Sequence, residues 1–154
     1  MKVLHITNEF TKKNFSISSL IIYISSYLNN NYKVNYSILT SSLEKTLFKT
    51  PQIDLINFTS WFHYFTKKKK LLEIFKNFEI IHIHGIWAPI QLISLLVCSN
   101  LKKTCVVHPH GMLLDEAVKS AGLIKFVLKK FTLFCLKFLI NNNIRFISIT
   151  QQET

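Results

Sequence analysis

Residues 79–108 read EIIHIHGIWAPIQLISLLVCSNLKKTCVVH, and this segment is the most informative part of the chain. It opens with an isoleucine-rich run at 79–84 and closes with a second apolar run at 104–108, both short enough for buried strands. Between them, residues 89–99 have the length and apolarity of a helix, with Pro89 near the first turn, where proline is tolerated. A strand, a helix and a second strand in this order predict a parallel βαβ unit.

The same alternation extends in both directions from this unit. We expect further strands at residues 3–7, 34–39, 53–58 and 144–149. We expect helices at residues 16–28, 61–78 and 114–140, the last in two pieces that meet near Gly122. Three asparagines at 29–31 are expected to end the first helix. This alternation predicts an α/β fold, a doubly wound, Rossmann-like parallel sheet with helices on both faces.

The composition fits one folded domain and excludes several other classes of protein. The chain has 154 residues, of which 49% are apolar and 18% charged, whereas a disordered chain needs low hydrophobicity and high charge. Gly85, Gly111 and Gly122 are the only glycines, so neither the G-x-G-x-x-G dinucleotide fingerprint nor a Walker phosphate loop can be written. We find no internal boundary and assign residues 1–154 to one domain.

The formal net charge of +11 raises the question of an anionic partner. Eighteen of the nineteen basic residues are lysines, and Arg145 is the single arginine. Because bidentate recognition of phosphate and guanine favours arginine, the sequence argues against sequence-specific binding of nucleic acid. Attraction to an anionic membrane surface and non-specific contacts with phosphates both stay open.

The cysteines and the apolar segments indicate where in the cell the protein is expected. Cys98, Cys105 and Cys135 form neither a C-x-x-C pair nor a metal-binding spacing, and their apolar neighbours suit buried, reduced thiols in a cytoplasmic protein. The first eight residues are too short a run, and too soon polar, for a signal peptide. The longest apolar run, 123–140, contains four lysines, which argues against a transmembrane span.

The same dipeptide follows two of the predicted strands. His84 and Gly85 stand at the end of one, and His110 and Gly111 follow the next. Since parallel sheets bind ligands beyond the carboxyl ends of their strands, we expect the two histidines to emerge at one edge of the sheet. Glycine there allows a ligand to approach the backbone closely. Well-packed turn histidines without a ligand are the alternative interpretation.

His82 and His108 each lie two residues before one of these histidines. We expect both to point into the interior of the sheet, as core residues or as supports for their neighbours. A zinc site built from the four histidines would have no carboxylate or cysteine pattern nearby, and we predict no metal.

Three segments resemble one known family. Residues 80–87 (IIHIHGIW), 106–113 (VVHPHGML) and 146–153 (FISITQQE) are similar to the amino-terminal domain of the family 4 group of GT-B glycosyltransferases. The opening residues, MKVLHIT, are similar to the first strand of that domain. The resemblance runs with gaps over the whole chain, and the His-x-His-Gly-x-Trp and Pro-His-Gly-Met blocks together are fairly specific.

The resemblance implies a retaining transferase that moves a hexosyl group from a nucleotide sugar to a glycan or lipid-linked acceptor. In such enzymes the amino-terminal domain mainly holds the acceptor, and the carboxy-terminal domain holds most of the nucleotide sugar. Carried over residue by residue, it makes His110 the catalytic residue in the cleft. The substrate-binding residues that it implies are His84, Gly85, Trp87, Gly111 and Met112. The nucleotide sugar is a co-substrate, and no metal or other cofactor is expected.

The chain departs from the family in two respects. The loop after the first strand, 8–16, has none of the usual glycines, and the donor-binding domain has no counterpart in 154 residues. We therefore expect an incomplete amino-terminal half that is inactive alone: a fragment, a truncated gene product, or one half of a split enzyme that a separate donor-binding half completes. The first alternative is a non-catalytic remnant or binding module with the same fold. The second is a basic protein that binds nucleic acid non-specifically.

Two lysine-rich segments are candidate contacts with a membrane. Lys67 to Lys70 follow four aromatic residues at 61–65, which suits either a solvated helical face or a membrane interface. The helix at 123–140 is basic and very apolar, and core packing is the alternative explanation. Acceptors of the resembled family are often lipid-linked. The hypothesis is therefore a cytoplasmic protein with peripheral contact to the inner face of the cell membrane.

Overall fold

The computed structural model describes residues 1–11, 15–44, 54–57, 69, 71–119, 122–139 and 142–147. Its strands are β1 (Lys2–Phe10), β2 (Asn35–Leu43), β3 (Asp54–Asn57), β4 (Ile80–His84), β5 (Thr104–His108) and β6 (Ile144–Phe146). Its helices are α1 (Phe15–Tyr32), α3 (Pro89–Leu101), α4 (Asp115–Lys119) and α5 (Leu123–Leu139). Residues 71–76 are also helical.

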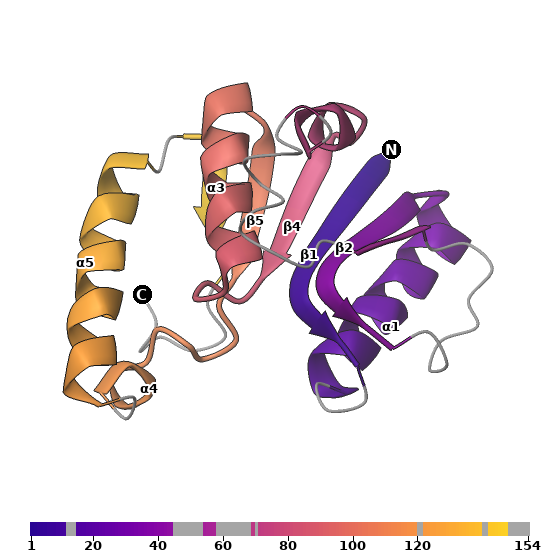
Figure 1. The fold of residues 1–154 in the computed structure, drawn as a ribbon. Helices are drawn as coiled ribbons and strands as arrows, with labels where there is room; N and C mark the ends of the chain where they lie inside the picture. The colour runs from indigo at the N-terminus through magenta and orange to yellow at the C-terminus, as the bar shows by residue number, and fades with distance from the viewer. Residues whose placement is uncertain are drawn as a thin grey trace.

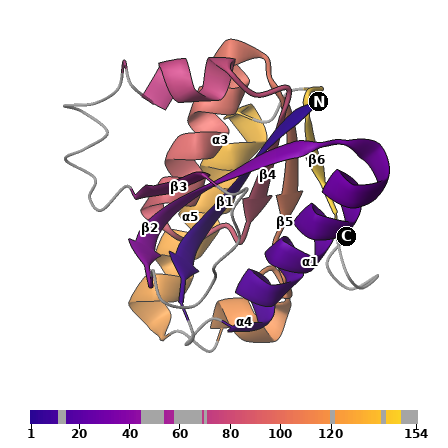
Figure 2. The same cartoon turned by 90° about the vertical axis from the view of Figure 1, so that its right-hand side faces the viewer.

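The six strands form one sheet in the order β3-β2-β1-β4-β5-β6, and every pairing is parallel. α1 lies on one face of the sheet, whereas α3 and α5 lie on the other (Figures 1 and 2). The chain thus winds from β1 outward to β3 and then from β4 outward to β6. The predicted α/β fold, a doubly wound Rossmann-like sheet with helices on both faces, is confirmed.

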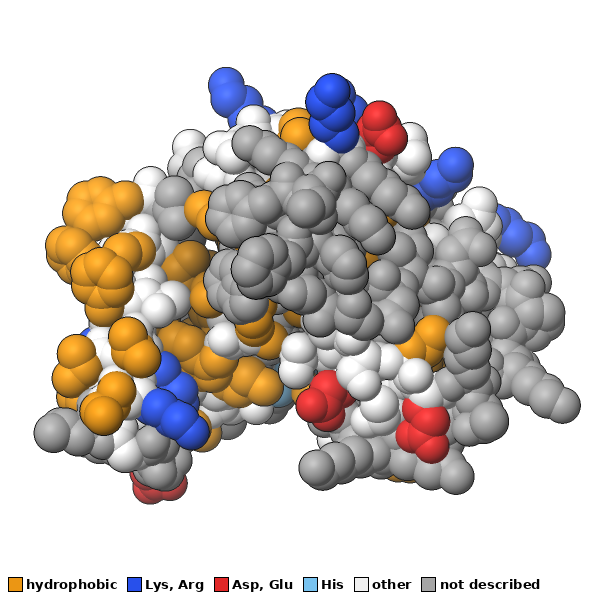
Figure 3. Space-filling model, in the orientation of Figure 1, with side chains coloured by type: hydrophobic (Ala, Val, Ile, Leu, Met, Phe, Trp, Pro, Cys, Tyr) orange, Lys and Arg blue, Asp and Glu red, His pale blue; other side chains and the backbone are white. Residues whose placement is uncertain are grey.

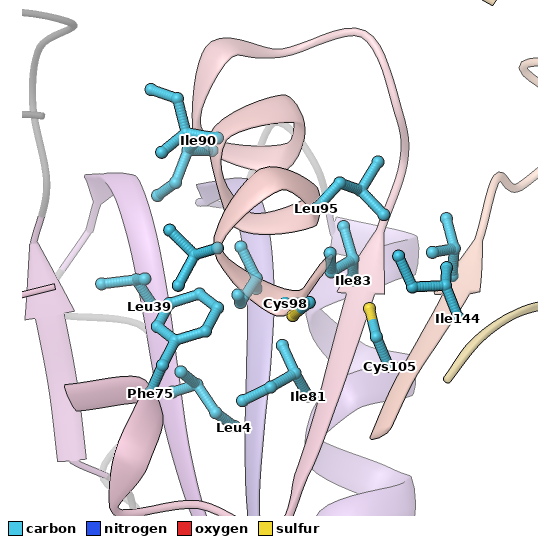
Figure 4. Close-up of a cluster of buried hydrophobic side chains, with 14 of the residues drawn as sticks. Leu4, Leu39, Phe75, Ile81, Ile83, Ile90, Leu95, Cys98, Cys105 and Ile144 are labelled. Carbon is cyan, nitrogen blue, oxygen red and sulfur yellow. The ribbon is translucent and has the colours of Figure 1, made fainter. Parts of the chain in front are cut away.

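The main hydrophobic core lies between the sheet and α3 (Figure 4). Ile81 and Ile83 of β4 and Cys105 of β5 point into it, and all three are fully buried. Because side chains alternate along a strand, His82 and His84 lie on the opposite face, which is the face that carries α1. The core and the histidines are therefore separated by the sheet itself.

The prediction of buried, unpaired thiols is confirmed for Cys98 and Cys105, which meet in this core, while Cys135 on α5 is only half-buried. The division of the helix at 114–140 is also confirmed. Gly122, with φ of +84°, separates α4 from α5.

Several predicted boundaries are wrong: β2 runs to Leu43 instead of residue 39, β6 ends at Phe146, and the helix before β4 ends at residue 76. α1 continues through the asparagines at 29–31 to Tyr32, and the Asn31 side chain donates to the Tyr27 carbonyl at 2.8 Å. It ends at Tyr32, and the next residue, Lys33, has a left-handed φ of +55° and donates its N–H to the Asn29 carbonyl. β1 is longer than predicted, because its polar end pairs with β2 through backbone hydrogen bonds.

No helix among the described residues combines the length and apolarity needed to cross a bilayer. The lysine and aromatic segment at 61–70 lies outside the described residues, apart from Lys69, which is exposed.

Candidate functional site at the carboxyl ends of β1, β4 and β5

An open pocket of about 430 Å³ lies where the winding of the sheet changes direction. The chain leaves β1 for α1 on one face and leaves β4 for α3 on the other. The carboxyl ends of β1 and β4 therefore part, and ligands of doubly wound folds bind in the crevice at such a switch point. The lining residues are Thr7, Asn8, Glu9, Ile17, His84, Trp87, Ala88, Gln91 and Met112.

The exit of β4 is shaped by a glycine and a glutamine. Gly85 has a φ of +89°, and its N–H donates to the His108 carbonyl at 2.8 Å. The Gln91 side chain donates to the His84 carbonyl, and its oxygen accepts the Ala88 N–H at 2.8 Å. A Cβ on Gly85 would collide with the Gln91 amide. The turn after β4 therefore requires glycine both for its φ and for its contact with α3.

The exit of β5 is a tight turn that brings His110 back toward β4. The Met112 N–H donates to the Pro109 carbonyl at 3.2 Å, and the two residues between them have φ of +56° (His110) and +80° (Gly111). Positive φ at both central positions is the signature of a type I′ turn. A left-handed non-glycine residue stores about 1–3 kcal/mol of strain, so the rest of the site must hold His110 in place.

His84 joins the two strand exits through a chain of imidazole rings. His5 Nδ1 lies 3.0 Å from His84 Nε2, and His84 Nδ1 lies 3.1 Å from His110 Nε2. The ring centroids of these pairs are 5.2 and 5.3 Å apart, and the planes are inclined by only 26° and 20°. In each pair, the distance between ring centres is longer than the N···N distance by roughly the sum of the two ring radii, as expected when the bonded nitrogens lie on the line between the centres. The rings therefore meet edge to edge, as hydrogen bonds between imidazoles require.

The burial of His5 fixes which atom donates and which accepts in each hydrogen bond of the His5–His84–His110 series. His5 Nε2 is buried and has no hydrogen-bond partner among the described residues. A proton there would be an unsatisfied buried donor, which costs about 1–3 kcal/mol. The His5 proton therefore sits on Nδ1 and is donated to His84 Nε2. His84 in turn carries its proton on Nδ1 and donates it to His110 Nε2, so a neutral His110 is protonated on Nδ1.

Burial keeps the histidines around His84 neutral. Desolvation, with a smaller effect of a charge on His82, lowers the pKa of His5 to about 3. Desolvation, with smaller effects of His108 and His110, lowers the pKa of His82 to about 4. The pKa of His84 is also well below its usual value, first because of burial and then because of its histidine neighbours. At neutral pH these three imidazoles have one proton each, as the directional chain requires.

His82 and His108 flank the His5–His84–His110 series of imidazoles on the same face of the sheet. The ring of His82 lies 4.1 Å from that of His84, and the ring of His108 lies 4.0 Å from that of His110, centroid to centroid. Both residues are half-buried. Of the two expected roles, that of core residues is wrong, because a period of two places His82 on the face of His84, while residues 81 and 83 face α3. The other role, support for their neighbours, agrees with their ring contacts to His84 and His110.

Two groups of three histidines have ring nitrogens within 4.8 Å of one another: His5, His82 and His84, and His84, His108 and His110. A metal needs lone pairs that converge on one point. The stacked rings of His108 and His110, inclined by 22°, instead present in-plane lone pairs that run side by side. Both nitrogens of His84 are also committed to hydrogen bonds with other histidines. The arrangement favours an imidazole chain over a metal centre.

Trp87 connects the two loops above the histidines. Its indole N–H donates to the Met112 carbonyl at 3.1 Å, which ties the exit of β4 to the exit of β5. The ammonium of Lys129 on α5 lies 5.0 Å from the centre of the Trp87 ring, within range of a cation–π contact. This contact anchors α5 beside the site.

The structure places the predicted site residues in two groups. His84, Trp87 and Met112 line the pocket. His110 is not among the lining residues, but it contacts one of them, His84, at 3.1 Å. Gly85 packs against Gln91 beneath the pocket, whereas an added Cβ on Gly111 would meet only Leu114, at 3.7 Å. His84 and His110 therefore emerge at one edge of the sheet, as predicted.

Sequence reasoning missed the contribution of β1 and α3 to the site. Thr7, Asn8 and Glu9 form the β1 side of the pocket, and their position at the end of a predicted strand and directly after it was the available signal. Gln91 is the third residue of α3, the position from which a glutamine bonds back to the helix start. His5 gave no signal, because its role depends on a partner 79 positions away.

No protein-family model matches the chain, and no curated protein matches it. Among solved structures, homoserine dehydrogenase from S. aureus is similar, with a TM-score of 0.50 and 12% identity over 97% of this chain. The chain spans only 32% of the length of that dehydrogenase. A short-chain dehydrogenase/reductase from Burkholderia vietnamiensis gives a TM-score of 0.50 and 11% identity over 97% of this chain and 84% of its own. These likenesses show the Rossmann-like fold alone.

Proposed function

We propose that this chain is the acceptor-side domain of a retaining sugar transferase, with the acceptor in the pocket at the switch point and His110 beside the transferring group. The observation that carries the proposal is the hydrogen bond between His84 and His110, which joins two His-Gly strand exits at the rim of one pocket. The resemblance of these two blocks to the family 4 group of GT-B glycosyltransferases gives the reaction class.

The lining of the pocket suits a sugar or another polyhydroxylated ligand. Its lining residues include Asn8 and Glu9 of β1, which have amide and carboxylate side chains, and the aromatic Trp87 that follows β4. A few polar groups beside an apolar surface are what small-molecule sites use to orient a ligand. A neutral histidine held by its neighbours can hydrogen-bond a sugar hydroxyl or stabilise charge that develops during transfer.

Dinucleotide binding is less well supported, although the structural neighbours are dehydrogenases. Their fold places a pyrophosphate over a glycine-rich turn after the first strand. In this chain residues 8–16 contain no glycine, and all three glycines of the sequence lie after residue 84. The backbone therefore lacks the close approach that a pyrophosphate requires at that turn.

The experiment is a transfer assay in which this chain is joined to a donor-binding GT-B half and supplied with nucleotide sugars and glycan or lipid-linked acceptors. His110→Ala should reduce kcat/KM by about 100-fold or more while the fold is retained by circular dichroism. Tyr23→Ala, on the exposed side of α1, is the matched control and should transfer at the parent rate.

Two outcomes would count against the proposal in different ways. Transfer at the parent rate by a folded His110→Ala variant would make His110 structural. Acceptor binding to the pocket without transfer by any joined chain would instead favour a non-catalytic binding module with this fold. Binding would be followed through the amide signals of Thr7, Asn8 and Glu9 in NMR titrations with the acceptors.

A further inference from the structure

We propose that α5 binds an anionic lipid surface through its outer face, defined here as Ile124, Val127, Leu128, Phe131, Phe134 and Phe138. Figure 3 shows apolar side chains gathered over α5 at one side of the molecule. The proposal does not depend on the proposed sugar transfer, since it concerns a different surface and a different ligand.

The outer face is apolar and open to solvent along the whole helix. Its six side chains are between 57% and 77% exposed, the extremes being Val127 and Ile124. Their spacing of three and four residues places them within an arc of about 120°, at about 100° per residue. Phe134 and Phe138 meet edge to face with centroids 5.1 Å apart, so within this face they pack on each other. A contiguous apolar patch of this kind marks an interaction site.

The opposite side of α5 accounts for the attachment of the helix to the domain. Leu136 is buried in the main core, and Leu133 packs against it. The ammonium of Lys129 donates to the Ala117 carbonyl at 2.9 Å and lies over the Trp87 ring. These contacts hold the inner side against α3 and α4, so the core does not explain the phenylalanines of the outer face.

Lysines border the outer face along both of its edges. By helical position, Lys125 lies beside one edge, and Lys130 and Lys137 lie beside the other. All three are exposed, and α5 contains no acidic residue. An apolar stripe with lysines on both sides is the pattern of a helix that lies in the plane of a membrane interface, with apolar side chains in the acyl region and ammonium groups at the phosphates.

The charge pattern selects lipid over a second copy of the chain. If two copies met through this face, the lysines beside it would come close together, and α5 has no carboxylate to offset their charge. Each copy also has a net charge of +11, which adds to the repulsion. An anionic bilayer supplies both the apolar layer and the opposite charge. Each lysine near such a surface contributes to binding, and the contribution falls off within a Debye length.

The test is co-sedimentation of the whole chain with sucrose-loaded vesicles of phosphatidylcholine, with or without about a third of phosphatidylglycerol. We expect strong partitioning to the anionic vesicles, weaker partitioning to the neutral ones, and loss at high salt. The triple variant Phe131→Ser, Phe134→Ser, Phe138→Ser should lose about 100-fold or more in partitioning. Lys130→Gln with Lys137→Gln should lose at least about tenfold, on anionic vesicles only.

Matched control variants distinguish vesicle binding through the outer face of α5 from non-specific binding by other exposed side chains. Tyr23→Ser with Tyr27→Ser removes exposed aromatic rings from α1, and Lys2→Gln with Lys76→Gln removes the same charge outside α5. Both pairs should bind vesicles much as the parent chain does. Circular dichroism checks that the serine variant folds, and the lysine pair, which leaves the apolar face intact, tests the same face independently.

A fluorophore on Cys135, which lies one turn from both Phe131 and Phe138, provides a second readout, because its emission should shift to the blue on anionic vesicles. Three results would overturn the proposal: no binding to anionic vesicles, equal losses in the α5 and control variants, or a lipid-independent dimer that the serine variant abolishes in sedimentation velocity.

Discussion

His84 Nδ1 lies 3.1 Å from His110 Nε2, and this contact joins the carboxyl ends of two neighbouring strands. His110 reaches it only because its own backbone is left-handed, with φ of +56°. The other nitrogen of His84 lies 3.0 Å from His5 Nδ1, and His5 is 1% exposed. A buried residue of the first strand is thus linked to the proposed catalytic histidine through His84.

The first prediction concerns which ring nitrogens of His5 and His84 are protonated. Long-range ¹H–¹⁵N spectra at pH 7.5 should show His5 and His84 protonated on Nδ1, since the reverse direction would bury an unsatisfied N–H on His5. His5→Phe removes the donor to His84 and should leave His84 as a mixture of tautomers, whereas Tyr23→Phe should change nothing. A parent His84 protonated on Nε2 would refute the assigned direction.

The second prediction concerns stability against pH. The pKa values of His5 and His82 are lowered to about 3 and about 4, and that of His84 is lowered as well, so below pH 6.5 the unfolded chain binds more protons than the folded one. Stability is therefore fully present above pH 6.5 and falls progressively toward pH 4. The free energy of unfolding in urea should be clearly lower at pH 5 than at pH 7.5.

A His82→Gln variant tests the cause of that loss. It removes one of the histidines whose pKa the fold lowers, so its stability should fall less steeply between pH 7.5 and pH 5 than that of the parent chain. A parent chain whose urea midpoint did not change over this range would show that the histidines are not held neutral by the fold.

The third prediction concerns the turn after β4. Gly85→Ala should destabilise the chain by about 2–4 kcal/mol, because it combines a positive φ with a collision against the buried Gln91. Gly122→Ala is the matched control: its φ is also positive, but no atom lies within 4 Å of the added Cβ. It should cost only about 1–2 kcal/mol. If thermal denaturation showed equal losses of stability in the two variants, the Gln91 side chain would have moved away from the added Cβ, and its contact with Gly85 would not require glycine.

The fold could be predicted because it depends on local patterns. Short runs rich in isoleucine and valine mark the strands at 80–84 and 104–108, and the helix between them follows from Pro89 and apolar spacing. The end of β1 could not be predicted in this way. Asn8 and Glu9 are polar, and they extend the strand only because β2 offers backbone partners beside them.

The candidate site was predicted in part for the same reason. His84 and His110 carry a local signal, since each stands next to a glycine at a strand exit. His5 and Gln91 do not, because their roles arise from contacts across the sheet and across the turn after β4. Hydrogen bonds between distant segments leave no periodicity in the sequence, so only the folded chain places these residues in the site.

The last prediction concerns the reactivity of the three thiols. Cys98 is buried, and its hydrogen bond with Cys105, followed by desolvation, raises the pKa of its thiol far above the usual value. Because the thiolate is the reactive form, Cys98 should resist aromatic disulfide reagents in the folded chain, and the fully buried Cys105 should be shielded from them as well. Cys135 is only half-buried and should react within minutes at pH 8. Cys135→Ser should remove the fast phase, and guanidinium should expose the remaining two thiols together as the core unfolds. Two fast thiols in the folded parent chain would mean that α3 does not close over β5 as the structure shows.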